Sequence, residues 1–369
     1  MNKKAALSLI LGCILSALML YIAFRKVPMT ELSAYLQTIN YLWLLPTVIV
    51  VLLTFLLRTV RWQIILRGAG GVSFWQAYHP LMIGFMMNCV LPGRIGEVAR
   101  PLLLKKERQV PLATGLATVA TERIFDILFL IVLFLAVFSE ISTQQGVAVK
   151  FGAYTLDSQT LGIIAWGMIR LSFFLLGLIL LLVFPWTRSR ITGTIASLTS
   201  LRILAGPGRI RGMLVKTILL VNKAIENISI GFNLVFYPGR LAACLLLTAA
   251  IWGLSLVAYM VLALGFPDMH LSAGDWTTVM VVVCFFIALP SAPGFWGLWE
   301  AGGVFALSLF GIGAKEAAGM TLVSHAVQML PVILVGFISA AMTSVNIFRI
   351  ADKQTMGRGG IGSEPHELA

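Results

Sequence analysis

Long apolar runs alternate with short polar connections along the chain. Six of these runs are long enough to cross a membrane, and they cover residues 5–24, 41–57, about 113–138, 163–184, 241–266 and 318–342. The first and the fifth contain no charged residue, and each is long enough as a helix for a hydrocarbon core of roughly 30 Å. The first run is followed at once by Arg25 and Lys26 rather than by a small-residue cleavage site. We therefore interpret it as a retained span and not as a signal peptide.

Two further regions, 74–104 and 276–312, each consist of two apolar arms around a Pro/Gly break. The distribution of basic residues determines how they should sit, because cytoplasmic connections are enriched in Lys and Arg. The connections 58–73, 105–108 and 185–240 are basic, as are both termini, whereas 139–160 and 267–275 are not. All the basic connections fall on one side only if each of the two regions enters the membrane and returns. We therefore predict two re-entrant hairpins that enter from opposite faces.

The two breaks also resemble each other in sequence. The first reads LPGRIGE (91–97) and the second reads LPSAPGFWGLWE (289–300), so both contain Pro-Gly-x-x-Gly before a glutamate. Opposed hairpins with related breaks are typical of an inverted repeat in a transporter. The predicted fold is therefore an all-α polytopic membrane protein with six full spans, two re-entrant hairpins and one transmembrane domain over residues 1–348.

Composition supports a membrane protein, since 59% of the residues are hydrophobic and only 11% are charged. The net charge of +12 would suggest nucleic acid in a soluble protein, but here the basic residues lie between the spans, so we expect no nucleic-acid partner. Within 185–240, residues 209–236 mix basic and apolar side chains, and we expect an amphipathic segment that contacts anionic lipid headgroups. Residues 349–369 are expected to form a disordered cytoplasmic tail. The four cysteines lie in apolar runs without metal-ligand spacing, and no metal or cofactor is expected.

The helix breaks are the first candidate for a binding site, because irregular backbone at membrane depth requires protein cover or a watery cavity. The residues expected to form them are Pro92, Gly93, Gly96, Pro293, Gly294 and Gly297. Arg94 adds a guanidinium suited to phosphate, and the helix that starts near Ile95 would direct its N-terminus toward the same anion. Glu97 and Glu300 lie beside the two breaks and complete this set of expected ligand contacts.

A second group of charges follows the first hairpin. Glu122 and Asp126 are four residues apart and share one helix face, and Arg123 lies between them. Charges at the bilayer centre cost at least about 2.5–3.5 kcal/mol each, so these side chains should not face lipid. We expect Asp126 to contact substrate and Arg100, Glu122, Arg123 and Arg170 to form a supporting network. A network that only pairs with itself and binds nothing is the alternative.

Some residues near the breaks have structural interpretations. His79 and His325 lie alone on apolar spans and are expected to be hydrogen-bonded packing residues rather than members of a proton relay. Trp296 and Trp299 are expected to anchor at the membrane interface, with stacking on a ligand as the alternative.

The motifs N..LPGR.GE..RP..L (88–104), ER..D (122–126) and PS.PG..G..E (290–300) together resemble the lysylphosphatidylglycerol synthase transmembrane family, also called flippase-like. The resemblance covers nearly the whole chain. It implies similarity to the flippase half of multiple peptide resistance factors, which move aminoacylated phosphatidylglycerol between leaflets, and to relatives that handle polyprenyl-linked lipids. The chain ends at residue 369 without room for an aminoacyl-transferase domain, so the resemblance implies translocation and not lipid synthesis. The second turn is bulkier than the Gly-rich version expected for the family.

The leading hypothesis is therefore a lipid translocase in a bacterial cytoplasmic membrane, with both termini on the cytoplasmic side. The alternative is an intramembrane enzyme such as a lipid-linked glycosyltransferase or phosphatase, in which Glu122 and Asp126 would hold Mg²⁺. A scaffold for a separate lipid-synthesising enzyme, and a homo-oligomer, remain open.

Overall fold

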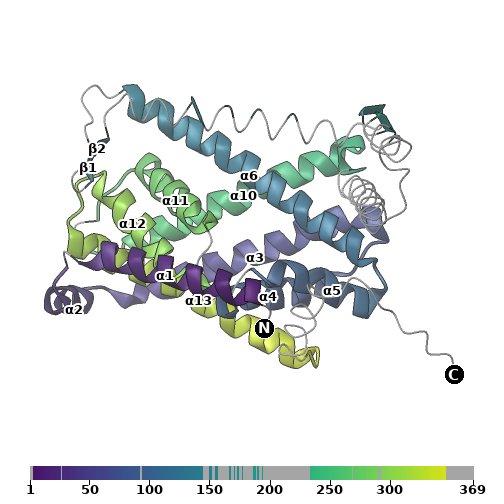
Figure 1. The fold of residues 1–369 in the computed structure, drawn as a ribbon, viewed down its shortest axis with the longest axis horizontal. Helices are drawn as coiled ribbons and strands as arrows, with labels where there is room; N and C mark the ends of the chain where they lie inside the picture. The colour runs from purple at the N-terminus through teal and green to yellow at the C-terminus, as the bar shows by residue number, and fades with distance from the viewer. Residues whose placement is uncertain are drawn as a thin grey trace, which may run out of the picture. The chain divides into compact units, whose positions relative to one another are not determined.

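A computed structural model describes residues 3–25, 27–91, 94–143, 149–151, 154–156, isolated positions between 166 and 193, 233–267, 269–289 and 292–345. Three of the described helical segments are long and apolar enough to cross a membrane: Tyr41–Leu66, Pro238–Ala263 and Ala314–Met342. The pair Gly12–Phe24 and Met29–Gln37 becomes a fourth if it is counted as one span bent by 76°. The chain is thus a multi-pass membrane protein built from helices (Figure 1).

The described residues up to 156 form six α-helices and a small hairpin of strands. The helices are α1 (Lys3–Phe24), α2 (Met29–Gln37), α3 (Leu44–Leu66), α4 (Phe74–Val90), α5 (Gly96–Arg108) and α6 (Leu112–Thr143). The strands β1 (Val149–Phe151) and β2 (Tyr154–Leu156) pair antiparallel, with Lys150 opposite Thr155.

The described residues from 233 to 345 form four α-helices. They are α10 (Pro238–Ala263), α11 (Ala273–Ala288), α12 (Leu298–Ser308) and α13 (Ala314–Met342), with a short 3₁₀ turn at Pro293–Phe295 between α11 and α12. The start of α11 follows from its sequence. Ser272 Oγ accepts a hydrogen bond from the Asp275 amide, and Asp275 accepts one from the Ser272 amide, which is a reciprocal N-terminal cap.

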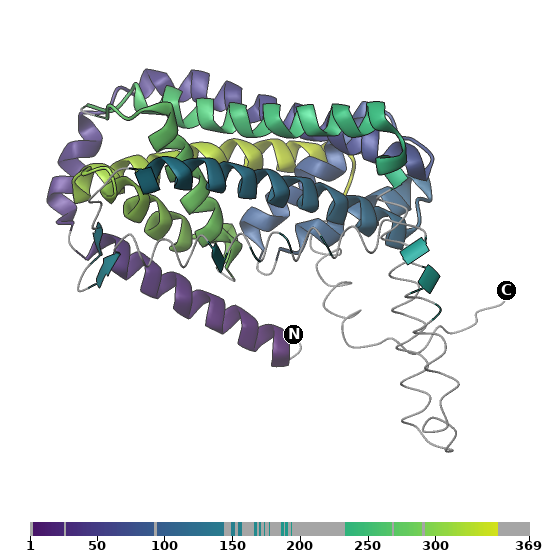
Figure 2. The ribbon, with the colours of Figure 1, turned by 90° about the horizontal axis from the view of Figure 1, so that it is seen from above.

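The chain divides into two compact units. The first takes residues 1–56, 78–100 and 252–369, and the second takes 57–77 and 101–251. In the first unit, α12 packs against α1, α11 and α13, and α13 also packs against α2 (Figures 1 and 2). Gly336 of α13 leaves room for the side chain of Met86 on α4, which brings these two helices close.

Both predicted breaks are observed as interruptions between two packed helical arms. α4 and α5 meet where Gly84 lies against Gly96 and Arg100, and α11 and α12 meet where Gly302 lies against the ring of Phe286. Small residues at these crossings let the helix backbones approach closely. The four helical arms lie at the predicted hairpins 74–104 and 276–312, but α5 continues to Arg108, so the predicted basic connection 105–108 is helical. The two re-entrant hairpins remain a prediction.

The prediction for the end of the second span was wrong. We predicted a span over 41–57 followed by a basic connection from residue 58, but α3 continues to Leu66. Arg58 and Arg61 therefore lie inside the helix, and Arg61 is fully buried. The helix continues because the apolar side chains Ile64, Ile65 and Leu66 follow these arginines, and Ile65 packs in a core with Phe125 of α6 and Cys244 of α10.

Several predictions fall outside the described residues. These are most of the span 163–184, residues 209–232 of the predicted amphipathic stretch 209–236, the tail 349–369 and the break residues Pro92 and Gly93. The other predicted break residues, Gly96, Pro293, Gly294 and Gly297, all lie in or beside the observed interruptions.

Candidate functional site at the two helix breaks

The two helix breaks meet within the first unit. Arg94, in the first break, donates a hydrogen bond from Nη2 to the Ile287 carbonyl oxygen over 2.6 Å, and its guanidinium lies 5.4 Å from the centre of the Phe295 ring. Ile287 belongs to the last turn of α11, where free carbonyls and the helix dipole favour a cation. The backbone also approaches closely, because a Cβ on Gly294 would lie 3.0 Å from the Cys89 carbonyl oxygen. Arg94 thus joins the first break to the second.

The N-terminus of α5 is not open to an anion. The Gly96 amide donates to Asn88 Oδ1 over 2.8 Å, and the next three amides donate to the carbonyls of Arg94 and Ile95. This corrects the expectation that these amides would bind a lipid phosphate. Any phosphate at this break would have to meet the exposed Arg94 guanidinium instead. Glu97 lies in the first turn of α5, three residues after Arg94, and is partly buried.

The second break is held against α1. Ser16 Oγ of α1 accepts a hydrogen bond from the Ala292 amide over 2.9 Å, and the Ser16 backbone contacts the place where a Cβ on Gly297 would lie. Gly297 also has a left-handed backbone with φ of 88°. Glycine is required here both for the conformation and for the close approach of α1.

Glu300 and His325 form a fully buried pair behind the second break. Glu300 Oε1 lies 2.5 Å from His325 Nδ1, and its Oε2 accepts a hydrogen bond from the Gly297 amide over 2.7 Å. The other ring nitrogen, Nε2, lies 2.8 Å from the Gly294 carbonyl oxygen. His325 is therefore hydrogen-bonded as predicted, but it contacts the predicted site residue Glu300 directly. The sequence offered no spacing signal for this contact, since the two residues are 25 positions apart on different helices.

The remaining predicted charges form a cluster in the second unit. Arg61 of α3 donates from Nη1 and Nη2 to the two carboxylate oxygens of Asp126 over 2.7 and 3.2 Å, and Nη1 also donates to Thr248 Oγ1 of α10. Glu122 lies 3.8 Å from the same guanidinium. Glu122 and Asp126 thus share one helix face, as their spacing predicted.

Two further arginines approach Asp126 Oδ2. Arg123 lies 3.3 Å from it and Arg58 lies 3.9 Å from it. We call the five residues Arg58, Arg61, Glu122, Arg123 and Asp126 the arginine cluster. Sequence reasoning missed Arg58 and Arg61. The signal that could have identified them is the apolar run that continues past both to Leu66.

The predicted network has two other members, Arg100 and Arg170. Arg100 is buried, and its guanidinium lies 5.8 Å from the centre of the Phe85 ring in α4. Arg170 is exposed, and no ion pair joins it to a carboxylate in the part of the chain that the structure describes.

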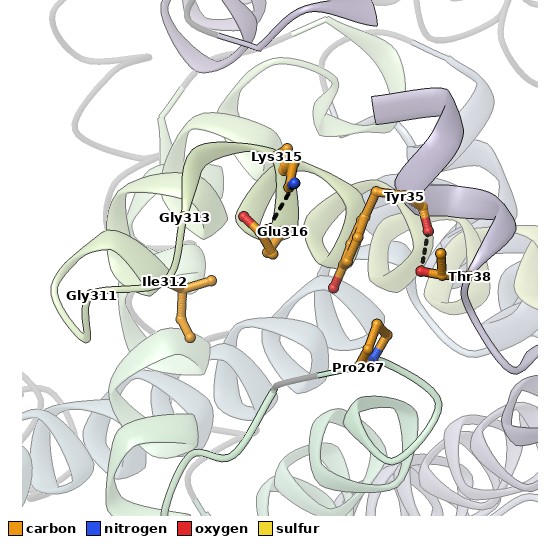
Figure 3. A pocket seen from close by; sticks show the side chains of 8 residues that line it. All are labelled: Tyr35, Thr38, Pro267, Gly311, Ile312, Gly313, Lys315 and Glu316. Atoms are coloured by element: carbon orange, nitrogen blue, oxygen red, sulfur yellow. Dashed lines mark hydrogen bonds and ion pairs between the residues drawn. The ribbon is translucent and has the colours of Figure 1, made fainter. Parts of the chain in front are cut away.

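A cavity of about 460 Å³ lies at the start of α13, and none of the residues that line it is a predicted site residue (Figure 3). Its lining comes from the end of α2, the turn after α10, the α12–α13 connection and the first turn of α13, and consists of Tyr35, Thr38, Pro267, Gly311, Ile312, Gly313, Lys315 and Glu316. Lys315 and Glu316 pair over 3.6 Å, so the lining carries balanced charge. It suits a polar group without a preference for an anion.

No group of three or more His, Cys, Asp or Glu side chains that could hold a metal ion is found among the residues described above. Glu122 and Asp126, the carboxylates suggested for Mg²⁺, both face guanidinium groups.

The family model for the lysylphosphatidylglycerol synthase TM region matches residues 9–336. The chain belongs to this family. The match includes both breaks, the arginine cluster and the Glu300–His325 pair, and it leaves out only the start of α1 and the end of α13 among the helices described above.

One curated relative is glycosyltransferase AglD of Haloferax volcanii, which is 26% identical over 124 residues. The match covers 33% of this chain and 20% of that protein, so this chain spans about a fifth of the length of its curated relative. No solved structure matches the chain.

Proposed function

We propose that this protein is a lipid translocase, which moves a phospholipid such as aminoacylated phosphatidylglycerol, or a polyprenyl-linked lipid, between the leaflets of a bacterial cytoplasmic membrane. The observation that carries this proposal is the meeting of the two helix breaks through Arg94. Family membership supports a role with membrane lipids. In transporters built from inverted repeats, substrate sites form where interrupted helices of the two repeats meet.

The headgroup phosphate would contact the guanidinium of Arg94, which is exposed and keeps its charge at every physiological pH. Glu97, in the next turn of chain, would contact an amine or a hydroxyl of the headgroup. The acyl chains would remain in the bilayer. Because Arg94 also holds the Ile287 carbonyl, a bound phosphate would compete for the guanidinium and loosen the contact between the breaks.

In this proposal the hairpins 74–104 and 276–312 enter the membrane from opposite faces. Rocking of the two repeats about the meeting point of their breaks would expose the headgroup to one side and then to the other. Six full spans and cytoplasmic termini complete the proposed topology. A cysteine introduced at Lys105 should then react with an impermeant reagent only from the cytoplasmic side.

The second candidate function is a lipid-modifying enzyme, and the match to a glycosyltransferase supports it. The positive charges around Glu122 and Asp126 disfavour an enzyme that holds Mg²⁺ at these two carboxylates. A cation at Glu122 and Asp126 would have to displace Arg61 from Asp126, with Arg58 and Arg123 also close. An enzyme site would therefore have to form elsewhere.

The proposal can be tested in liposomes that contain the purified protein and fluorescent lipids with anionic, zwitterionic and aminoacylated headgroups, or a polyprenyl phosphate sugar. We expect the protein to accelerate leaflet exchange of at least one lipid, and Arg94→Ala to slow it by about tenfold or more, because a lost charged hydrogen bond is worth about 1.5–3 kcal/mol.

Arg108→Ala is the matched control, since it removes an exposed arginine from the last turn of α5. Equal exchange in the wild type and Arg94→Ala would contradict the site. Absence of exchange, together with turnover of a lipid-phosphate substrate, would favour the enzyme.

A further inference from the structure

The buried Glu300–His325 pair contains a hydrogen whose position follows from its neighbours. Both side chains are fully buried, and three contacts fix them: Nε2 to the Gly294 carbonyl, Oε2 to the Gly297 amide, and Nδ1 to Oε1. A carbonyl oxygen can only accept, so Nε2 must carry a hydrogen. The Gly297 amide can only donate, so Oε2 must be an acceptor.

One further proton must then lie between Oε1 and Nδ1. If it is on Nδ1, the pair is an imidazolium and a carboxylate; if it is on Oε1, the pair is a neutral imidazole and a carboxylic acid. In both cases the pair is neutral overall, which suits two groups that are completely shielded from water. Without that proton the carboxylate would face the lone pair of Nδ1 across 2.5 Å, and the contact would be repulsive.

The surroundings of His325 favour the proton as well. The imidazole stacks on the Trp299 ring with centres 4.8 Å apart and planes 6° apart, and the Trp296 ring centre lies 4.5 Å away. A cation over an indole face is attracted by the ring. Nε2 also lies 3.1 Å from Met329 Sδ, a weak acceptor.

Other charges on the helices packed around the pair do not neutralise it. Within the described segments these side chains are Arg25 after α1, Glu31 on α2, Asp275 at the start of α11, Arg94 at the facing break, and Lys315 and Glu316 in the first turn of α13. None of these residues forms an ion pair with Glu300 or His325. The pair therefore depends on its own proton.

Loss of that proton would change the contacts of the second break. The proton leaves to water, the electron pair of the N–H bond stays on the imidazole, and Glu300 remains a carboxylate. The neutral imidazole then has a single N–H group, which can reach Glu300 or the Gly294 carbonyl but not both. The charge-assisted bond to Glu300 is the stronger one, so the bond to Gly294 should break.

We propose that the Glu300–His325 pair is a proton-binding site that latches the second break onto α13, and that release of its proton frees the break for lipid movement. Gly294 immediately precedes Phe295, the residue under the Arg94 guanidinium, so the latch acts directly on the contact between the breaks. The effect on lipid movement rests on the proposed function, whereas the proton-binding site does not.

Glu300→Gln distinguishes a proton site from a purely structural pair. The carboxamide oxygen can accept from the Gly297 amide, and its NH₂ group can donate to Nδ1 of a neutral imidazole whose Nε2–H still reaches Gly294. All three contacts are then retained without the additional proton that the carboxylate–imidazole pair requires. A structural role predicts that this variant behaves as wild type at every pH, whereas the latch proposal predicts a break that no longer opens.

The latch is tested by amide hydrogen exchange of segment 292–300 in the detergent-solubilised full chain, from about pH 5.5 to about pH 9, across the range in which histidine ordinarily titrates. The rate of the wild type is divided by that of the Glu300→Gln protein at each pH, which removes the base catalysis common to both. We expect this ratio to rise by about fivefold or more with pH. A ratio that does not change with pH would overturn the latch.

A second experiment measures lipid exchange by the same proteins in liposomes with an imposed pH gradient. We expect the gradient to change leaflet exchange by the wild type and not by the Glu300→Gln protein. If the gradient leaves the rate of lipid exchange unchanged in both proteins, the proposed coupling between proton release and lipid movement is wrong. If no lipid moves in any protein while the hydrogen-exchange ratio rises, the proposed function fails and the proton site stands. His270→Gln and Glu31→Gln change exposed residues of the same types and should match the wild type in both assays.

Discussion

The arginine cluster and the Glu300–His325 pair are two solutions to the same problem, which is to hold ionisable groups inside an apolar protein. The arginine cluster sets three guanidinium groups against two carboxylates from α3 and α6. The pair sets one imidazole against one carboxylate from α12 and α13. The first has an excess of one positive charge, whereas the second can be neutral.

The difference lies in whether a proton can leave. A guanidinium remains protonated in proteins, so the arginine cluster keeps its charges under all ordinary conditions. An imidazole can gain or lose a proton, and in the proposed latch this change alters the hydrogen bonds of the pair. A permanent ion cluster thus suits a region that stabilises the fold. A shared proton suits the second break, which must open in the proposed latch.

Arg61→Leu should have the largest effect on stability. It leaves Asp126 and Glu122 buried among fewer donors, and breaking a buried ion pair costs about 3–5 kcal/mol. We expect little folded protein, measured by thermal unfolding in detergent and by the yield of monodisperse protein. Arg67→Ala changes a nearby exposed arginine and should have almost no effect. Equal losses from both would show that the arginine cluster does not support the fold.

His325→Ala should destabilise the first unit less, by about 2–3 kcal/mol, because buried Glu300 loses its partner but can take up a proton and become neutral. Thermal unfolding of the two proteins in detergent measures this. An unfolding temperature equal to that of the wild type would show that His325 does not support the second break.

Gly297→Ala tests how closely the second break packs against α1. Both the left-handed backbone and the Ser16 contact oppose a Cβ, and we expect a loss of about 2 kcal/mol or more. Gly311→Ala is the control, because Gly311 has a φ of 74° but open space around it, and strain alone should cost about 1 kcal/mol. Similar unfolding temperatures for the two variants would mean that α1 is free to shift.

Arg94→Ala should have the smallest effect on stability, about 1 kcal/mol, because the hydrogen bond to Ile287 lies at an exposed position. Its effect on lipid exchange should be far larger. Unfolding temperature and exchange rate measured on the same preparation separate these two effects. A large fall in the unfolding temperature would make Arg94 a structural residue of the break.

Much of the fold follows from local sequence. The apolar runs predict α3, α10 and α13, and the breaks at 91–97 and 289–297 follow from Pro and Gly close together in a short stretch. Single prolines do not break the other helices, since Pro80, Pro101 and Pro331 lie inside α4, α5 and α13. The reciprocal cap at Ser272 and Asp275, and the shared face of Glu122 and Asp126, are also local, because both depend on residues three or four positions apart.

The end of α3 could not be predicted in the same way. Charge in a sequence normally indicates a connection between spans, and Arg58 and Arg61 are ordinary signals of that kind. They remain in the helix because Asp126 and Thr248, which are 65 and 187 positions away, satisfy the Arg61 guanidinium. The free energy that keeps this charge buried comes from partners that are distant in the chain.

By itself, the sequence determined that this chain is a helical membrane protein, that two helices are broken, and which charged residues lie beside the breaks. Only the tertiary structure decided what those charges touch. Arg94 holds a carbonyl of the other hairpin, the amides of α5 are already occupied, and Glu300 finds a histidine on α13. The physical reason is that helix propensity and hydrophobicity act over a few residues, whereas the protonation and partners of a buried group depend on every helix that excludes water from it.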